Sequence, residues 1–297
     1  MVQLRDSIGR FACSKPKPEV WAIVGDTQVP FHDPAAVELA TRVIAAVKPD
    51  HLVYNGDMID FWSISKHQPS RHEILGAVSL QEEIDRTIAV QDKLASGLDK
   101  RARLHCIDGN HENRLEKFFG VGPQTVLGSL KALRMEEVFR YKERGFTSYH
   151  PYGEGIWITD NLFVYHGQFV SPLPGVSVKK EIDAIGASVI MNHVHRRSDI
   201  RFRQGEHEWR GIENGCLCQL ASTYSTMTNW AHALTIVRKY DNRHWDADVV
   251  DIINDGDTVY CIYGGEKYTV DATYSDNMSL PWRPHRNIIF EKGNNEN

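Results

Sequence analysis

The sequence predicts an α/β fold, and three observations support this prediction. Short apolar runs with strand character alternate with amphipathic helical segments up to about residue 200. The segment from about 208 to 268 changes to closely spaced β segments separated by Asn, Asp and Gly turns. The chain has 297 residues, of which 41% are hydrophobic and 25% charged, so it can bury a large core like an ordinary globular protein.

Five apolar runs are the predicted strands of the sheet. They cover residues 20–24, 51–54, 103–107, 162–165 and 188–191. Four later segments, 208–215, 233–241, 244–252 and 258–263, have β character as well. We expect these to complete the fold as mixed or antiparallel strands, or to form a second sheet.

Four segments between the strands are predicted to be helical. The first begins with Asp33 as N-cap and Pro34 at the first helical position. The second begins at a capping box formed by Ser79 and Glu82 and runs to about residue 100. The third covers about 125–138, and the fourth ends at Gly186, which fits a left-handed C-cap.

Composition limits the class of protein further. We expect a single domain over 19–290, preceded by an arm at 1–18 and followed by a frayed tail at 291–297. The net charge of −5 disfavours a protein that coats nucleic acid. No apolar run is long enough for a signal peptide or a membrane span, and the five Cys form no CxxC pair. We therefore expect reduced, buried thiols and a cytoplasmic protein without a membrane partner.

Side chains of the types that bind metals follow each of the five predicted strands. They are Asp26 and Gln28, then Asp57, then Asn110, then His166, then His193 and His195; Asp60 and His111 lie beside them in the same turns. Because the carboxyl ends of the strands of an open α/β sheet converge, we expect these side chains to meet at one edge of the sheet. Carboxylates, amide oxygens and imidazoles are ligands of Mn, Fe, Zn and Mg, and the lack of Cys argues against a closed structural zinc site.

In this order, the motifs resemble those of the calcineurin-like metallophosphoesterases. The pattern is Asp-x-Gln, Gly-Asp-x-x-Asp, Gly-Asn-His-Glu, a lone His and His-x-His, and it runs from Asp26 to His195. The resemblance implies a four-layer α/β/β/α sandwich with two mixed sheets. It also implies a dinuclear metal centre between the tops of the two sheets.

The resemblance also implies a role for each residue. One ion would be held by Asp26, Gln28, Asp57 and His195, and the other by Asp57, Asn110, His166 and His193. Asp57 would bridge the two ions, His111 would be the general acid, and Asp60 would orient His111.

The chain departs from the family pattern at two positions. Gln28 stands where the family usually has His, and Asn192 where it has Gly. An amide oxygen is a harder and weaker ligand than imidazole, so we expect looser binding at the first ion. Mn is the expected metal, with Mg, Fe, Zn or Ni as alternatives. His32 is an alternative ligand, but we expect it to lie in a surface loop.

The implied function is metal-dependent hydrolysis of a phosphoester by a bridging hydroxide. The family's protein phosphatases carry Arg-Gly after the second Asp, where this chain has Phe61 and Trp62, so a protein substrate is disfavoured. We expect a phosphodiesterase that acts on a nucleotide or a nucleic-acid-like substrate.

The alternatives are a phosphomonoesterase and a non-catalytic binding module in which Gln28 weakens the first metal site so that it no longer holds its ion. The sequence assigns no substrate-binding residue. Arg114 is either a phosphate contact or an ordinary helix-surface arginine, and the Phe61–Trp62 pair either stacks on substrate or belongs to the core.

Overall fold

The structure is a computed structural model that describes residues 17–65, 78–120, 122–220 and 228–276. Residues 1–16 of the predicted arm, residues 277–290 of the predicted domain and the whole predicted tail lie outside these ranges. The division into arm, single domain and tail stays a prediction.

The first sheet joins the three early strands to the C-terminal β segments. Its order is β13-β12-β11-β10-β1-β2-β3-β4. The parallel strands are β1 (Glu19–Val24), β2 (His51–Asn55), β3 (Arg103–Ile107) and β4 (Phe146–His150). The antiparallel strands are β10 (His232–Lys239), β11 (Trp245–Asn254), β12 (Thr258–Tyr263) and β13 (Glu266–Asp271).

The second sheet has the order β5-β6-β7-β9-β8. Its strands are β5 (Gly155–Thr159), β6 (Leu162–Tyr165), β7 (Ser188–Met191), β8 (Arg197–Gln204) and β9 (His207–Asn214). All five predicted early strands are confirmed. The segment from 208 to 268 does not form one unit, because β9 pairs with β7 and β8 while the later strands extend the first sheet.

The helices begin where their caps predict. In α1 (Pro34–Val47), the Asp33 carboxylate accepts the N–H groups of Ala35 and Ala36, both at 3.0 Å. In α3 (Leu80–Ala95), the Ser79 hydroxyl accepts the Glu82 N–H at 3.2 Å. This helix ends five residues before the predicted position. Gly97, just beyond its end, packs against α1 so closely that any side chain there would strike Ala45. The fourth predicted helix is α6 (Val176–Ile185), with Gly186 as its left-handed cap.

The predicted helix over 125–138 is wrong as a continuous element. The chain there forms the 3-10 segments η2 (Gly122–Ser129) and η3 (Lys131–Leu133) and the short α5 (Met135–Val138). Leu130 and Arg134 have extended backbones, which interrupt the helical hydrogen bonds on either side of η3. Two further elements lie after the strand ends: α4 (Asn113–Phe119) and the 3-10 turn η1 (Trp62–Ile64).

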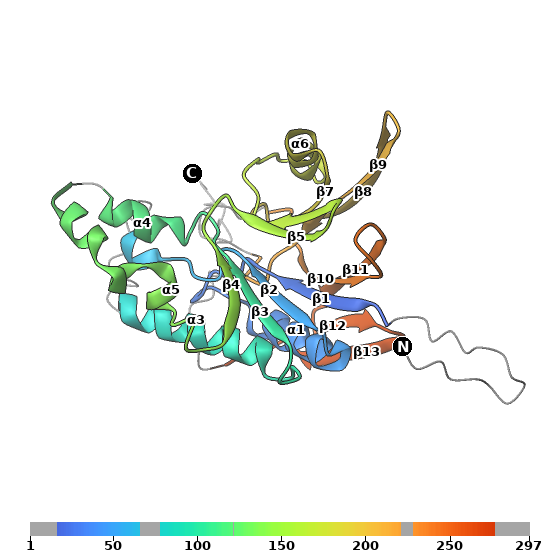
Figure 1. Cartoon of the computed structure of the whole chain (residues 1–297). Coiled ribbons are helices and arrows are strands. Elements are labelled where there is room, and N and C mark those ends of the chain that lie inside the picture. The colour runs from blue at the N-terminus through green and yellow to red at the C-terminus, as the bar shows by residue number, and fades with distance from the viewer. Residues whose placement is uncertain (1–16, 66–77, 121, 221–227, 277–297) are drawn as a thin grey trace, which may run out of the picture.

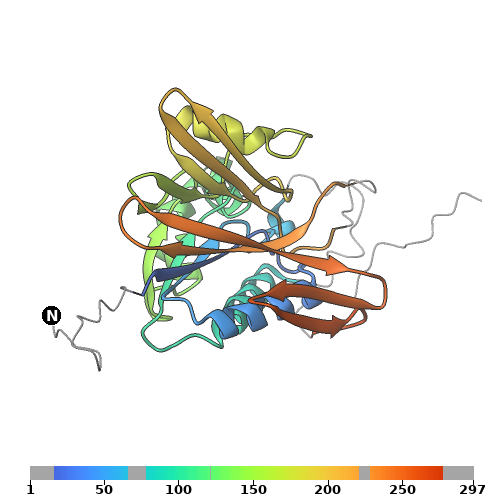
Figure 2. The same ribbon diagram turned by 90° about the vertical axis from the view of Figure 1, so that its right-hand side faces the viewer.

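Three separate apolar clusters hold the layers together. The first lies between α1, α3 and the first sheet, and Leu39 and Leu52 belong to it. The second lies between the two sheets, where Ile23 faces the second sheet while its neighbour Ala22 faces the helices. The third lies between α6 and the second sheet. Figures 1 and 2 show the resulting four-layer α/β/β/α sandwich, with α1 also packed against β12 and β13.

Membrane crossing by a helix was tested only over the described ranges. No helix there combines the length and the hydropathy needed to cross a bilayer, and the longest, α3, has 16 residues.

Candidate metal centre

The predicted ligands follow strands of two sheets rather than one. Strands β1, β2 and β3 end at one edge of the first sheet, and β6 and β7 end at the facing edge of the second. Backbone hydrogen bonds fix the loops beyond the strands: the Gln28 N–H donates to Asp57 O at 2.8 Å, and the Asn192 N–H donates to His166 O at 3.0 Å. The expected meeting point at one edge of a single sheet is therefore corrected to a position between the facing edges of two sheets.

Asp57 and His166 are the centre of the first group. His166 Nε2 lies 3.4 Å from Asp57 Oδ1 and 3.2 Å from Asn110 Oδ1. The ring of His193 stands edge-on to His166 with centroids 5.1 Å apart. The other nitrogen of His166, Nδ1, lies 2.9 Å from Asn55 O, which orients its Nε2 toward the carboxylate.

Asp26 and His195 are the centre of the second group. His195 Nε2 lies 3.7 Å from Asp26 Oδ1 and 3.2 Å from Gln28 Nε2. The other oxygen of Asp26, Oδ2, accepts the His193 N–H at 2.9 Å and links the two groups. Gln28 presents its amide nitrogen to His195, so a ligand role requires the amide to turn and present its oxygen.

The carboxylate, amide and imidazole groups of these residues are of the types that bind divalent cations. Donor atoms of Asp57, His166 and His193 lie within 4.8 Å of one another, as do those of Asp26, Asp57 and His195. Within each group, the side-chain nitrogen and oxygen atoms lie 3.2–3.7 Å apart, which is longer than most direct hydrogen bonds. These distances approach the separation of about 3.0–3.4 Å between two ligand atoms bound to the same small cation. Asp26 Oδ1 is buried and has no hydrogen-bond partner among the described residues, which is costly for a carboxylate without a cation.

The protonation states of His193 and His195 suit metal binding, whereas at His166 the effect of burial is outweighed by the Asp57 carboxylate, which raises the pKa of His166 to about 10. Burial lowers the pKa of His195 to about 3, and burial together with nearby His166 lowers that of His193 to about 4. Both rings are therefore neutral near pH 7, the form that donates a lone pair to a metal. Burial by itself raises the pKa of Asp57, but His111 and His166 beside it lower it well below its ordinary value.

Backbone strain is concentrated at the predicted ligands. Five of them have left-handed φ angles: Asp26 (51°), Gln28 (46°), Asp57 (51°), His193 (71°) and His195 (56°). Such angles are uncommon for residues other than glycine and gather at functional sites. Sequence patterns carry no direct signal for this feature.

His111 and Asp60 meet as predicted, and Arg114 joins them. His111 Nδ1 lies 3.3 Å from Asp60 Oδ1, and Arg114 Nη1 donates to the same oxygen at 2.6 Å. Arg114 Nη2 lies 3.0 Å from His111 Nε2. Burial lowers the pKa of His111, but the carboxylates of Asp57 and Asp60 outweigh it and raise the pKa to about 9. Arg114 therefore belongs to the site, and its signal in the sequence is its position one helical turn after His111.

Glu112 has a positioning role that the sequence analysis missed. Its buried carboxylate accepts the N–H groups of Asp57 at 2.9 Å, Met58 at 2.7 Å and Gly109 at 2.8 Å. Gly109 lies so close to Asp57 that an added Cβ would stand 2.1 Å from Asp57 Oδ1. The Gly and Glu of the Gly-Asn-His-Glu motif thus fix the loop that carries the shared carboxylate.

The profile of the calcineurin-like phosphoesterases matches residues 21–211, which include every predicted ligand. The chain belongs to this family. Solved structures similar to it include Vps29 from Chaetomium thermophilum, with 12% identity, a TM-score of 0.41 and coverage of 87% of this chain and 98% of that one. Vacuolar Protein Sorting 29 from Cryptosporidium parvum is similar at 12% identity and a TM-score of 0.39, over 86% of this chain and 96% of that one. No curated protein sequence matches the chain.

His32 does not lie where the sequence predicted, and the structure decides between the two roles left open for Phe61 and Trp62. His32 is not on the surface: it is fully buried, and its Nε2 lies 3.3 Å from the Asp276 carboxylate. Phe61 is fully buried in the first apolar cluster, and Trp62 is nearly so, edge-on to Phe31. The pair belongs to the core and offers no stacking surface to a substrate.

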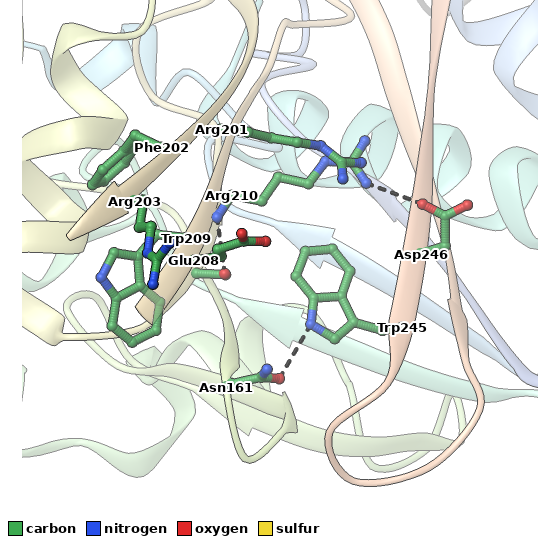
Figure 3. A pocket seen from close by; sticks show the side chains of 10 residues that line it. Asn161, Arg201, Phe202, Arg203, Glu208, Trp209, Arg210, Trp245 and Asp246 are labelled. Carbon is green, nitrogen blue, oxygen red and sulfur yellow. Dashed lines mark hydrogen bonds and ion pairs between the residues drawn. The ribbon is translucent and has the colours of Figure 1, made fainter. Parts of the chain in front are cut away.

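A second hollow of about 400 Å³ lies at the opposite end of the sandwich, near the amino ends of β6 and β7 (Figure 3). There Arg210 pairs with Asp199 at 2.8 Å and with Asp246 at 3.2 Å. The Trp245 ring N–H donates to Asn161 Oδ1 at 3.1 Å. These polar groups satisfy one another, unlike those of the metal centre.

Proposed function

We propose that this phosphoesterase is a metal-dependent hydrolase that binds two divalent ions and cleaves a phosphodiester of the nucleotide or nucleic-acid class. The observation that carries the proposal is the shared position of Asp57 between two groups of donor atoms, one with His166 and His193 and the other with Asp26 and His195. Gln28 and Asn110 complete the two sets. Because two of the donors are amides, we propose Mn²⁺ as the ion.

Bound ions would supply Lewis acidity, which acidifies a water molecule and offsets the charge of the phosphoryl oxygens. The chain's own residues provide the proton for the leaving group. His111 Nδ1 faces Asp60, and this contact favours a proton on Nδ1 and stabilises the charged ring. His111 is thereby poised to protonate a departing alkoxide from Nε2.

Arg114 has a part in this step. In the structure its Nη2 lies 3.0 Å from His111 Nε2. A substrate that draws Arg114 onto a phosphoryl oxygen would leave the protonated Nε2 facing the leaving group. Asp60 already balances the charge of Arg114, so this pair adds no net positive charge that would favour a doubly charged monoester over a singly charged diester.

The described cysteines, 106, 216, 218 and 261, are free and buried, which supports the proposal that the protein works in a reducing compartment such as the cytoplasm.

The test compares bis-p-nitrophenyl phosphate with p-nitrophenyl phosphate at saturating Mn²⁺. We expect faster turnover of the diester. His111→Asn should lower kcat about 10²–10⁴-fold on an alkyl-leaving-group diester while the bound metal stays unchanged. Faster turnover of the monoester would point to a phosphomonoesterase. A fully metal-loaded chain that turns over neither substrate would support a binding module instead.

A further inference from the structure

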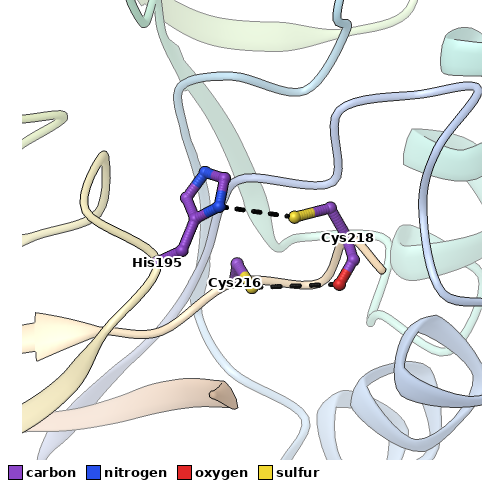
Figure 4. A group of neighbouring side chains, drawn as sticks. All are labelled: His195, Cys216 and Cys218. Atoms are coloured by element: carbon purple, nitrogen blue, oxygen red, sulfur yellow. Dashed lines mark hydrogen bonds between the residues drawn. The ribbon is translucent and has the colours of Figure 1, made fainter. Parts of the chain in front are cut away.

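The two metal-facing histidines differ in what their outer nitrogens contact. His166 Nδ1 faces a backbone carbonyl, the usual arrangement for a metal-bound histidine. His195 Nδ1 faces sulfur instead, with Cys218 Sγ at 3.6 Å (Figure 4). Cys216 comes from the same segment, and its Sγ, Cys218 Sγ and a ring nitrogen of His195 all lie within 4.8 Å of one another.

We propose that Cys216, Cys218 and the Nδ1 atom of His195 form a separate site for a zinc-class ion. The donor set of two thiolates and one imidazole occurs in protein zinc sites. With bond lengths of about 2.3 Å to sulfur and about 2.05 Å to nitrogen, a tetrahedral zinc ion separates S from N by about 3.6 Å. The distance between Cys218 Sγ and His195 Nδ1 equals this value.

The backbone holds the three donors in place before any ion binds. The Leu217 N–H, between the two cysteines, donates to Asp26 O at 3.1 Å. The Cys216 N–H donates to Ala231 O at 2.9 Å, and the Ala231 N–H donates to His195 O at 2.9 Å. Cys216 is fully buried and Cys218 nearly so. The donors thus converge on a rigid, water-poor position, which favours a soft ion over Mn²⁺ or Mg²⁺.

Binding at this position has a consequence for the proposed function. Neutral imidazole has one lone-pair nitrogen and carries its proton on the other. An ion on His195 Nδ1 leaves the proton on Nε2, the nitrogen that faces Asp26. Occupancy of the thiolate site therefore withdraws His195 from the dinuclear centre. This consequence rests on the proposed function, whereas the thiolate site does not.

The test uses the full-length, reduced, metal-free chain titrated with Co²⁺ under anaerobic conditions. We expect a near-ultraviolet thiolate-to-cobalt charge-transfer band that Zn²⁺ abolishes by displacing Co²⁺. The Cys216→Ser/Cys218→Ser variant should lose the band and bind one equivalent less Zn²⁺. The matched control Cys13→Ser/Cys106→Ser/Cys261→Ser keeps only the proposed pair and should retain the band. Circular dichroism establishes that each variant is folded.

Two results would overturn the site: no band when Co²⁺ is bound to the unmodified chain, or a band that persists without Cys216 and Cys218. The first would leave Cys218 as a hydrogen-bond partner of His195 only. Hydrolysis of the diester is measured on separate portions of the metal-free chain that receive Mn²⁺ and no Co²⁺ or Zn²⁺. Absence of hydrolysis there refutes the proposed function alone, and absence of the band in the Co²⁺ titration refutes the thiolate site alone.

Discussion

The two ends of the sandwich handle buried polar groups in opposite ways. At the amino ends of β6 and β7, the Arg210 guanidinium pairs with the Asp199 and Asp246 carboxylates, and Figure 3 draws its contact with Asp246. At the carboxyl ends, Asp26 and Asp57 are both buried, and Asp26 Oδ1 lacks a hydrogen-bond partner among the described residues. The same fold thus places carboxylates that pair with an arginine at one end. At the other end it places a buried carboxylate oxygen that lacks a hydrogen-bond partner among the described residues.

This difference teaches how to separate a structural polar cluster from a functional one. Both contain charged groups in close contact, so neither charge nor burial alone distinguishes them. The distinguishing feature is whether each buried polar atom has a hydrogen-bond or ion-pair partner. A buried carboxylate without a hydrogen-bond donor destabilises the fold unless a cation binds to it. Five predictions test the comparison, beginning with the largest effect on hydrolysis.

Asp57→Asn should abolish measurable hydrolysis and reduce bound metal to less than one ion per chain. The change removes the only carboxylate shared by the two groups of donors. Metal analysis and turnover of the diester check the prediction. Asp246→Asn, at the other end, is the control and should leave both measurements unchanged. Two bound ions in Asp57→Asn would contradict the bridging role.

Gly109→Ala should lower turnover about 10²-fold, the cost of displacing a catalytic group by about 1 Å. The new methyl group would stand 2.1 Å from Asp57 Oδ1, so the carboxylate has to move. Turnover at saturating Mn²⁺ checks this effect. Gly120→Ala is the control, because its φ is −80° and the nearest atom to an added Cβ is 3.1 Å away. Equal activity of the two variants would show that the position of Asp57 is not critical.

Gln28→His should tighten the weaker ion about tenfold, equivalent to about 1.4 kcal/mol, and shift its preference from Mn²⁺ toward Zn²⁺. Imidazole is a softer and stronger donor than an amide, and Gln28 already lies 3.2 Å from His195 Nε2. Isothermal titration with each ion measures the change. Unchanged affinity and preference would mean that Gln28 is not a ligand.

Glu83→Gln should flatten the pH dependence of stability at the edge of the centre. Glu83 Oε1 accepts the Trp62 N–H at 2.7 Å, close to Asp60 along the chain, and burial raises its pKa from 4.5 to about 7. A raised pKa means that the stabilisation is complete below about pH 4.5 and is lost as the pH rises through about 7.

At about 1.4 kcal/mol per pKa unit, the loss approaches about 3 kcal/mol. Urea unfolding at pH 5 and pH 8 should therefore show a smaller difference in Glu83→Gln than in the unmodified chain. An unchanged difference would assign the pH dependence to other groups.

Arg210→Met should leave diester turnover unchanged and lower the free energy of unfolding by about 1–3 kcal/mol. The change leaves Asp199 and Asp246 without their shared cation, but both are partly exposed and regain water. Denaturant unfolding and turnover are measured together. A large loss of turnover in a folded variant would show that the amino-end hollow takes part in the reaction after all.

Much of the fold follows from local patterns. Capping residues such as Asp33 and Ser79 position helices because their side chains bond backbone groups only two or three residues away. Strands β2 and β7 are buried at every position, because layers cover both faces of each sheet. By contrast, β8 is mostly charged or exposed and gives no such pattern, so it escaped prediction, as did β4, β5 and β13.

At the candidate site too, the sequence identified some features and missed others. Gly-Asp and Gly-Asn-His-Glu place their polar residues directly after strands, so the sequence identified the residues that meet there. It did not reveal that Glu112 binds the loop of Asp57, that Arg114 pairs with Asp60, or that Cys218 faces His195. Each of these contacts joins segments that only the folded chain brings together.

The sequence by itself determined the five early strands, the helix caps and the types of side chain at each strand end, since these depend on neighbours within a few residues. Only the tertiary structure decided which sheet each strand joined. It also decided which nitrogen of His195 faces carboxylate and which faces sulfur. The physical reason is that strand pairing and ring orientation depend on hydrogen bonds and burial between segments far apart in the chain, which no local pattern specifies.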